Sequence, residues 1–124
     1  MNNRGQSLVL FVLLIPLVLM ILYAVYEIGR MTLLKHELDN INTIALDYGI
    51  DKINDENIDI EIKELIEKNK NDIDKIDIKI LDDKMYITLE DSLSKKTSLF
   101  KNVFIVKSSY VGYMDNDKKK IERD

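Results

Sequence analysis

The stretch LVLFVLLIPLVLMILYAVY, residues 8–26, decides how this chain is organised. It contains no charged side chain. As a helix it would be about 28 Å long, close to the ~30 Å hydrocarbon core of a bilayer. The sequence therefore predicts a helix that spans a membrane once.

A cleaved secretory signal is the alternative for such a stretch, but its apolar region would cover only about 7–15 residues and end in a small-x-small site. Here the run is followed by Glu27-Ile28-Gly29-Arg30, which is no such site. Pro16 lies within the run, where a membrane helix tolerates a kink. Tyr23 and Tyr26 fit an aromatic belt at one interface.

The helix is expected to continue beyond the membrane surface. An apolar stripe at helical spacing follows the span, with polar residues on the other faces. The stripe consists of Met31, Leu34, Leu38, Ile41, Ala45 and Tyr48. Gly49 then offers a stop signal for the helix. We expect the stripe to pack against the C-terminal part of the chain; a short coiled-coil seam with a partner is the alternative.

The rest of the sequence predicts a small α+β domain. Ile58, Ile62, Leu65 and Ile66 recur at helical spacing, although Ile58, Ile60 and Ile62 also alternate as in a strand. Alternation in 76–80 and 85–89, around Asp82-Asp83-Lys84, predicts a β-hairpin. A third strand is expected within Val103 to Tyr113, and a fourth after the turn Asp115-Asn116-Asp117.

The fold class is thus α+β: a long N-terminal helix, a short second helix and an antiparallel sheet of three to four strands. The expected divisions are the transmembrane helix at 6–28, its amphipathic extension at 29–50 and a soluble domain at 51–124.

Composition argues against several function classes. The net charge of -4 and a pI near 5.1 disfavour a nucleic-acid partner, and the chain has no cysteine.

The single histidine, His36, lies on the polar side of the long helix, and the four glycines form no phosphate-binding loop. The acidic pairs Asp72/Asp74, Asp82/Asp83 and Asp115/Asp117 lack the spacing of a calcium loop. Lys118 to Lys120, with Arg123, are expected to form an edge-strand tail. We therefore expect no enzymatic activity, metal, cofactor or small-molecule substrate.

The N-terminus resembles that of TadE-like pseudopilins. The resemblance rests on Arg4-Gly5-Gln6-Ser7, on Pro16-Leu17 within the leucine-rich span and on the closing Tyr26-Glu27-Ile28-Gly29-Arg30. It implies a pilin-like fold, with a leader at 1–5 that a membrane prepilin peptidase removes by cutting between Gly5 and Gln6. The implied partners are this peptidase, membrane lipid and other pilin or pseudopilin subunits. It also implies a structural role in a Tad-type pilus or a related bacterial secretion apparatus.

One position departs from that family pattern. Leu10 stands where the family usually has a glutamate, which favours a minor subunit over a major repeating one. The alternative function is an unprocessed single-pass anchor or adaptor whose small extracytoplasmic domain binds another protein.

Orientation follows from the resemblance rather than from charge, because Arg4 and the α-amino group are balanced by Arg30 and Lys35. The pilin-like interpretation requires a cytoplasmic N-terminus and an extracytoplasmic C-terminal domain. The three-residue tail before Arg4, which offers nothing to translocate, agrees with it.

Overall fold

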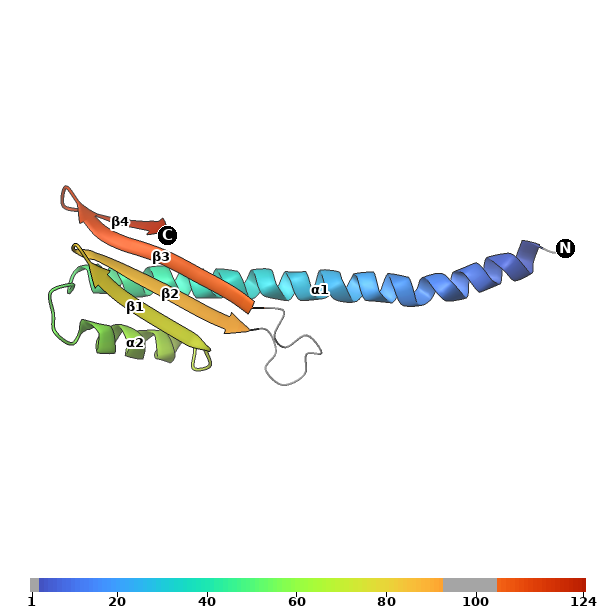
Figure 1. Ribbon diagram of the computed structural model, residues 1–124, viewed down its shortest axis with the longest axis horizontal. Coiled ribbons are helices and arrows are strands. Elements are labelled where there is room, and N and C mark those ends of the chain that lie inside the picture. The colour runs from blue at the N-terminus through green and yellow to red at the C-terminus, as the bar shows by residue number, and fades with distance from the viewer. Residues whose placement is uncertain (1–2, 93–104) are drawn as a thin grey trace.

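The computed structural model describes residues 3–92 and 105–124, and it shows a long helix that carries a small α+β domain at one end (Figure 1). Helix α1 spans Asn3–Ile50 and helix α2 spans Ile58–Asn69. The strands are β1 (Lys75–Leu81), β2 (Lys84–Ser92), β3 (Ile105–Asp115) and β4 (Lys118–Arg123). They form one antiparallel sheet in the order β1-β2-β3-β4. The predicted fold class is confirmed.

Helix α1 is continuous from the apolar run into the domain. Its 48 residues correspond to about 72 Å at 1.5 Å per residue. The helix ends at Ile50, so Gly49, the expected stop signal, lies inside its last turn and has no positive φ. The absence of a side chain at Gly49 instead lets Met85 and Ile62 pack directly against the backbone of α1. A Cβ at this position would lie 2.6 Å from Met85 Sδ and 2.9 Å from Ile62 Cδ1.

Helix α2 follows the helical spacing of its isoleucines rather than their alternation. Ile58, Ile62 and Ile66 are buried, whereas Ile60 is 59% exposed. The helix runs back along α1: the Tyr48 hydroxyl donates to Glu61 Oε2 at 3.1 Å near its start. Beyond its end, the ammonium of Lys70 lies 3.6 Å from a carboxylate oxygen of Glu37.

Two tight turns join the outer strands to the inner ones. Asp82 and Asp83 have φ of 52° and 61°, and Asn116 and Asp117 have φ of 50° and 63°. Positive φ at both central residues is the requirement of a type I′ hairpin turn, and Asn and Asp tolerate it. Lys84, predicted as part of the first turn, is instead the first residue of β2.

The third strand extends farther than its apolar residues indicated. The prediction covered Val103 to Tyr113, whereas β3 runs to Asp115. Val103 and Phe104 lie outside the described residues. The expected fourth strand is confirmed as β4, which pairs with β3 at one edge of the sheet.

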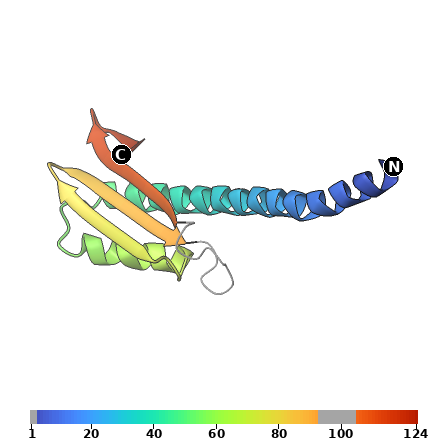
Figure 2. The same ribbon diagram turned by 45° about the vertical axis from the view of Figure 1, so that its right-hand side comes forward.

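The domain has two layers, with both helices on the same face of the sheet (Figures 1 and 2). On β2 the buried side chains of Met85, Ile87 and Leu89 alternate with the half-exposed Tyr86 and Thr88. Each fully buried aliphatic side chain contributes about 1.5–3 kcal/mol relative to an exposed one. The core lies between strands β2 and β3, the second half of α1 and the buried face of α2.

An ion-pair cluster ties β4 to the end of α1. The Lys119 ammonium lies 2.6 Å from Asp51 Oδ2 and 3.3 Å from Asp47 Oδ1. The hydrogen bond to Asp51 is the main reason that the pKa of Lys119 is raised above its usual value. The lysine-rich edge strand is thereby attached to the helix.

Candidate functional site: the span and its junction with the domain

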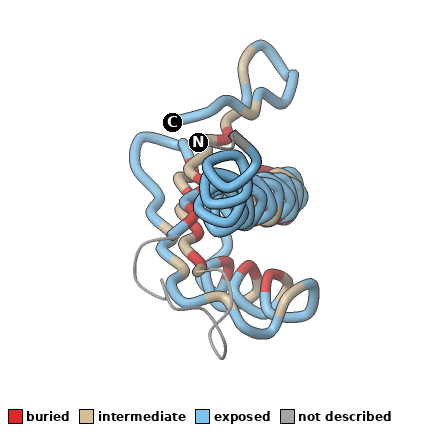
Figure 3. Tube along the Cα trace, turned by 90° about the vertical axis from the view of Figure 1, so that its right-hand side faces the viewer, coloured by how far each residue is buried: buried red, intermediate tan, exposed pale blue. Residues whose placement is uncertain are grey.

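The first half of α1 projects from the domain with its side chains uncovered. Every residue from Arg4 to Tyr26 is exposed, as Figure 3 shows by the pale blue of the projecting helix. Within the described part of the chain, α1 is the one helix long and apolar enough to cross a membrane. Bare apolar side chains along such a length fit a single-pass membrane anchor.

Pro16 lies inside this projecting part. Proline has no N–H, so the carbonyl four residues earlier, that of Val12, loses its intrahelical donor. Figure 1 shows α1 bending gently in its first half without a break. The helix is thus continuous through the proline.

The predicted processing residues lie in the first turns of α1. Gly5 and Gln6 are both exposed, and a Cβ added at Gly5 would meet nothing within 4 Å. Glycine is about 1 kcal/mol less favourable than alanine in a helix interior. The helical turn that contains Gly5 is therefore exposed, and its glycine has a low helix propensity.

The predicted packing stripe faces the chain's own domain. Leu34, Leu38, Ile41 and Ala45 are buried in the core, and Met31 packs against it. A seam with a separate partner is therefore not available to these residues in this structure. Tyr48 departs from the prediction, because it is 37% exposed and turns its hydroxyl toward α2.

The buried arc of α1 also includes a polar residue, Asn42. Its side-chain amide donates to the carbonyls of Ile87, at 3.0 Å, and Ser108, at 3.2 Å. The Ser108 hydroxyl accepts from Asn42 at 3.3 Å and donates to Asp39 Oδ1 at 2.6 Å. Asn42 thus connects α1 to both central strands. Sequence reasoning missed it, since one asparagine on a helix is typical of a solvated face.

Asp39 and Lys35 continue this network toward the end of the domain that is nearest the apolar run. The Lys35 ammonium lies 3.0 Å from Asp39 Oδ1 and donates to the carbonyl of Lys107 at 2.7 Å. Burial of the Asp39 carboxylate raises its pKa, but the Ser108 hydroxyl and the Lys35 ammonium outweigh this effect and hold the pKa below its usual value.

A buried acid marks the end of the apolar run. Glu27 is 2% exposed; its Oε1 lies 3.3 Å from the Arg30 guanidinium, and its Oε2 has no hydrogen-bond partner. The Arg30 guanidinium also lies 5.7 Å from the ring centroid of Tyr26. These three residues all belong to the closing motif of the resemblance. They form the boundary between the bare helix and the domain.

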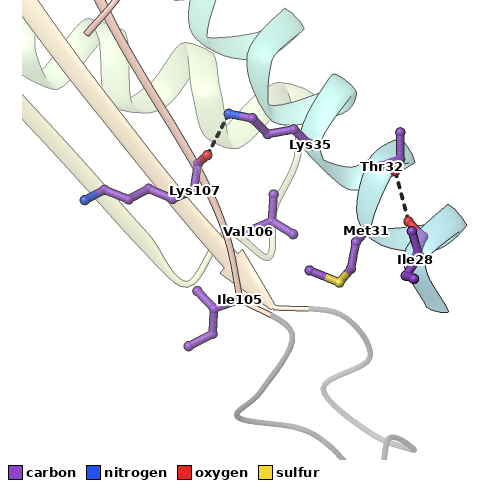
Figure 4. Close-up of a pocket in the computed structure, with 7 residues that line it drawn as sticks. All are labelled: Ile28, Met31, Thr32, Lys35, Ile105, Val106 and Lys107. Carbon is purple, nitrogen blue, oxygen red and sulfur yellow. Dashed lines mark hydrogen bonds between the residues drawn. The ribbon is translucent and has the colours of Figure 1, made fainter. Parts of the chain in front are cut away.

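Two hollows flank α1 just beyond this boundary. One, the Met31 groove, has a volume of about 450 Å³ and is bounded by α1 and the start of β3 (Figure 4). It is lined by Ile28, Met31, Thr32, Lys35, Ile105, Val106 and Lys107. The other, of about 280 Å³, is more polar and includes Arg30, Glu37, Lys70 and Asp91.

No group of three or more histidine and acidic side chains that could hold a metal ion occurs among residues 3–92 and 105–124. His36 is exposed on α1. Comparison of the chain with models of known protein families, with curated proteins and with solved structures finds no match.

Proposed function

We propose that this protein is a minor pseudopilin, a structural, non-enzymatic subunit of a Tad-type pilus or a related bacterial secretion apparatus. The observation that carries the proposal is the continuity of α1. One helix is bare and apolar over residues 8–26 and is then buried as the scaffold of the domain. A force on the anchor is therefore transmitted to the domain without an intervening hinge or linker.

This architecture suits a subunit that is stored in a bilayer and later moved into a filament. In the bilayer the bare helix contacts lipid, and in a filament the same side chains would pack against the helices of other subunits. The domain would remain outside the helical bundle. Its own core does not depend on residues 8–26, which contribute no buried side chain.

The processing step is proposed from the resemblance and supported by accessibility. Prepilin peptidase would cut between Gly5 and Gln6, both of which are exposed and remote from the domain. Removal of residues 1–5 would place the apolar run at the new N-terminus. The N-terminus would be cytoplasmic and the domain extracytoplasmic.

Mass spectrometry of the membrane-extracted protein tests this step in a strain with active prepilin peptidase. We expect a mature chain that begins at Gln6, and a Gly5→Leu variant that remains intact because the side chain obstructs the residue next to the cut. Gly29→Leu is the matched control, since neither glycine has an atom within 4 Å of an added Cβ. A wild-type chain that begins at Met1 in that strain would contradict the processing.

Leu10 bears on the type of subunit. It is an uncharged, 59% exposed side chain at the position where the family usually carries a glutamate. A carboxylate in hydrocarbon is costly unless paired, so its absence removes a device for registering neighbouring subunits in a filament core. We therefore propose a minor subunit.

The same residue supports the second candidate, an unprocessed anchor or adaptor. The two candidates differ in where the protein is found after surface filaments are sheared from cells. A filament subunit accompanies the sheared fraction in its processed form, whereas an adaptor remains in the membrane at full length.

A further inference from the structure

The Met31 groove lies at the depth of the lipid headgroups if residues 8–26 occupy the hydrocarbon core. Ile28 and Thr32 are two and six residues beyond Tyr26, which places them about 3 and 9 Å above the end of the apolar run. The polar layer of one leaflet is about 5–7 Å thick. The groove therefore begins within the headgroup layer at Ile28 and extends a few ångströms above that layer at Thr32.

Its lining is mainly apolar and continuous with the surface of the span. Val25 is 61% and Ile28 60% exposed, and they are three residues apart on the same face of α1, so uncovered apolar surface leads from the span toward the groove. Figure 4 shows the Met31 side chain extending from α1 toward β3, with Val106 on the opposite wall. Apolar surface at this depth is stabilised by hydrocarbon rather than by water.

Neither lysine among the lining residues presents a free ammonium to the groove. The Lys35 ammonium is engaged by Asp39 and by the carbonyl of Lys107. The Lys107 side chain points away from α1 in Figure 4. We therefore do not expect these two lysines to bind an anionic headgroup in the groove.

We propose that the Met31 groove accommodates a phospholipid of the surrounding leaflet, which inserts its glycerol backbone and the first methylenes of an acyl chain between α1 and β3. The domain would then rest on the bilayer rather than stand clear of it. Contact would be governed by shape and apolar surface, so zwitterionic and anionic lipids would serve equally. The inference depends on the span lying in a bilayer and not on entry into a pilus.

Fluorescence quenching by lipid tests the proposal on the full chain, which has no tryptophan of its own. The test variant is Met31→Trp, reconstituted into phosphatidylcholine vesicles with or without bromine on the acyl chains. Leu33→Trp is the depth control, since Leu33 is 71% exposed, two residues along and therefore on a different face of α1. Leu81→Trp, 61% exposed at the far end of the hairpin, is the control for a residue in water.

We expect brominated lipid to quench Met31→Trp more strongly than Leu33→Trp, which lies about 10 Å above the apolar run and outside the groove. Leu81→Trp should stay unquenched, and anionic lipid should not change the result. Thr32→Trp provides a second reporter at an exposed lining position and should match Met31→Trp.

Quenching of Leu33→Trp alone would overturn the proposal, because lipid would reach that depth without entering the groove. Blue-shifted emission of Met31→Trp that escapes bromine and reverts on dilution with lipid would also overturn it, and would assign the groove to a second copy of the chain. Absence of quenching in all variants would overturn the proposal without bearing on the membrane anchor, because none of the four tryptophans lies within residues 8–26. An intact N-terminus in cells would bear only on the pilus proposal.

Discussion

The side-chain amide of Asn42 donates a 3.0 Å hydrogen bond to the main-chain carbonyl of Ile87, which fastens the second half of α1 to strand β2. The same amide reaches Ser108 on β3, so one helical side chain connects to both central strands. Asn42 Oδ1 is buried without a partner. Burial of Oδ1 without a partner costs free energy. The hydrogen bonds that the amide donates fix the position of α1 along the sheet.

Replacement of Asn42 by alanine should lower the free energy of unfolding by about 1–3 kcal/mol, because the hydrogen bonds of the side-chain amide are lost and a cavity remains. Denaturant titration of the full chain in detergent micelles measures the change. Asn40→Ala is the control, since Asn40 is exposed on the same helix and should change stability by less than about 0.5 kcal/mol. Equal effects of the two substitutions would show that the network contributes nothing to stability.

The two glycines in the second half of α1 should respond in opposite ways to the same substitution. Gly49→Val should destabilise the domain by about 1–3 kcal/mol, because the new side chain enters space occupied by Met85 and Ile62. Gly29→Val should be neutral or slightly stabilising, since nothing lies within 4 Å and valine is the better helix former. Thermal unfolding of both variants in the same detergent makes the comparison. Similar losses at the two positions would contradict the close approach at Gly49.

Asp39 should contribute to acid denaturation. Its pKa in the folded protein lies below the usual 3.8, so the folded state binds fewer protons than the unfolded state. The stabilisation is therefore fully present above the unfolded-state pKa and is lost as the pH falls toward the folded-state pKa. We expect Asp39→Asn to lose less stability than the wild type between about pH 5 and pH 2, as measured by unfolding titrations across that range.

Lys35→Met is the companion variant for this prediction, because it removes the ammonium 3.0 Å from the Asp39 carboxylate but leaves the carboxylate in place. It should reduce the dependence of stability on pH in the same direction and by a smaller amount, since Ser108 still donates to Asp39. A pH dependence identical to that of the wild type in both variants would refute the role of Asp39.

The regular parts of this fold were predictable because they depend on local periodicity. A charge-free run predicted the span, spacing of three and four placed Leu34 and Leu38 in the core, and alternation placed the hairpin. The turn at Asp82-Asp83 followed from the tolerance of aspartate for positive φ. In each case the signal lies within a few residues of the feature that it predicts.

The exceptions depend on neighbours that periodicity does not reveal. The second half of α1 packs against both the sheet and α2, so its buried arc is wider than one stripe and includes Leu46 and Asn42. Tyr48 lies at the margin of that arc, where its hydroxyl meets Glu61. The burial of Glu27 likewise gave no sequence signal, because an acid after an apolar run usually marks the start of solvent.

The orientation of the chain is the last prediction, and the fold allows it to be tested at both ends. Arg4, on the N-terminal side of the apolar run, would be held by an anionic cytoplasmic leaflet by about 1 kcal/mol. The β3–β4 turn, which contains Asn116, lies in the domain at the opposite end of α1.

The chain has no native cysteine, so a single introduced thiol reports its own position. We expect Asn116→Cys to react with a membrane-impermeant maleimide in intact cells stripped of any wall barrier, and Asn3→Cys to react only after the cells are permeabilised. Both are labelled in a strain without prepilin peptidase, because cleavage after Gly5 would remove residue 3. Asn116 occupies a turn position with φ of 50°, which cysteine adopts less readily, so Asp124→Cys, at an exposed position in the same domain, serves as a second reporter. Labelling at Asn3→Cys but at neither domain position would reverse the orientation, and the pseudopilin proposal would then have to be abandoned.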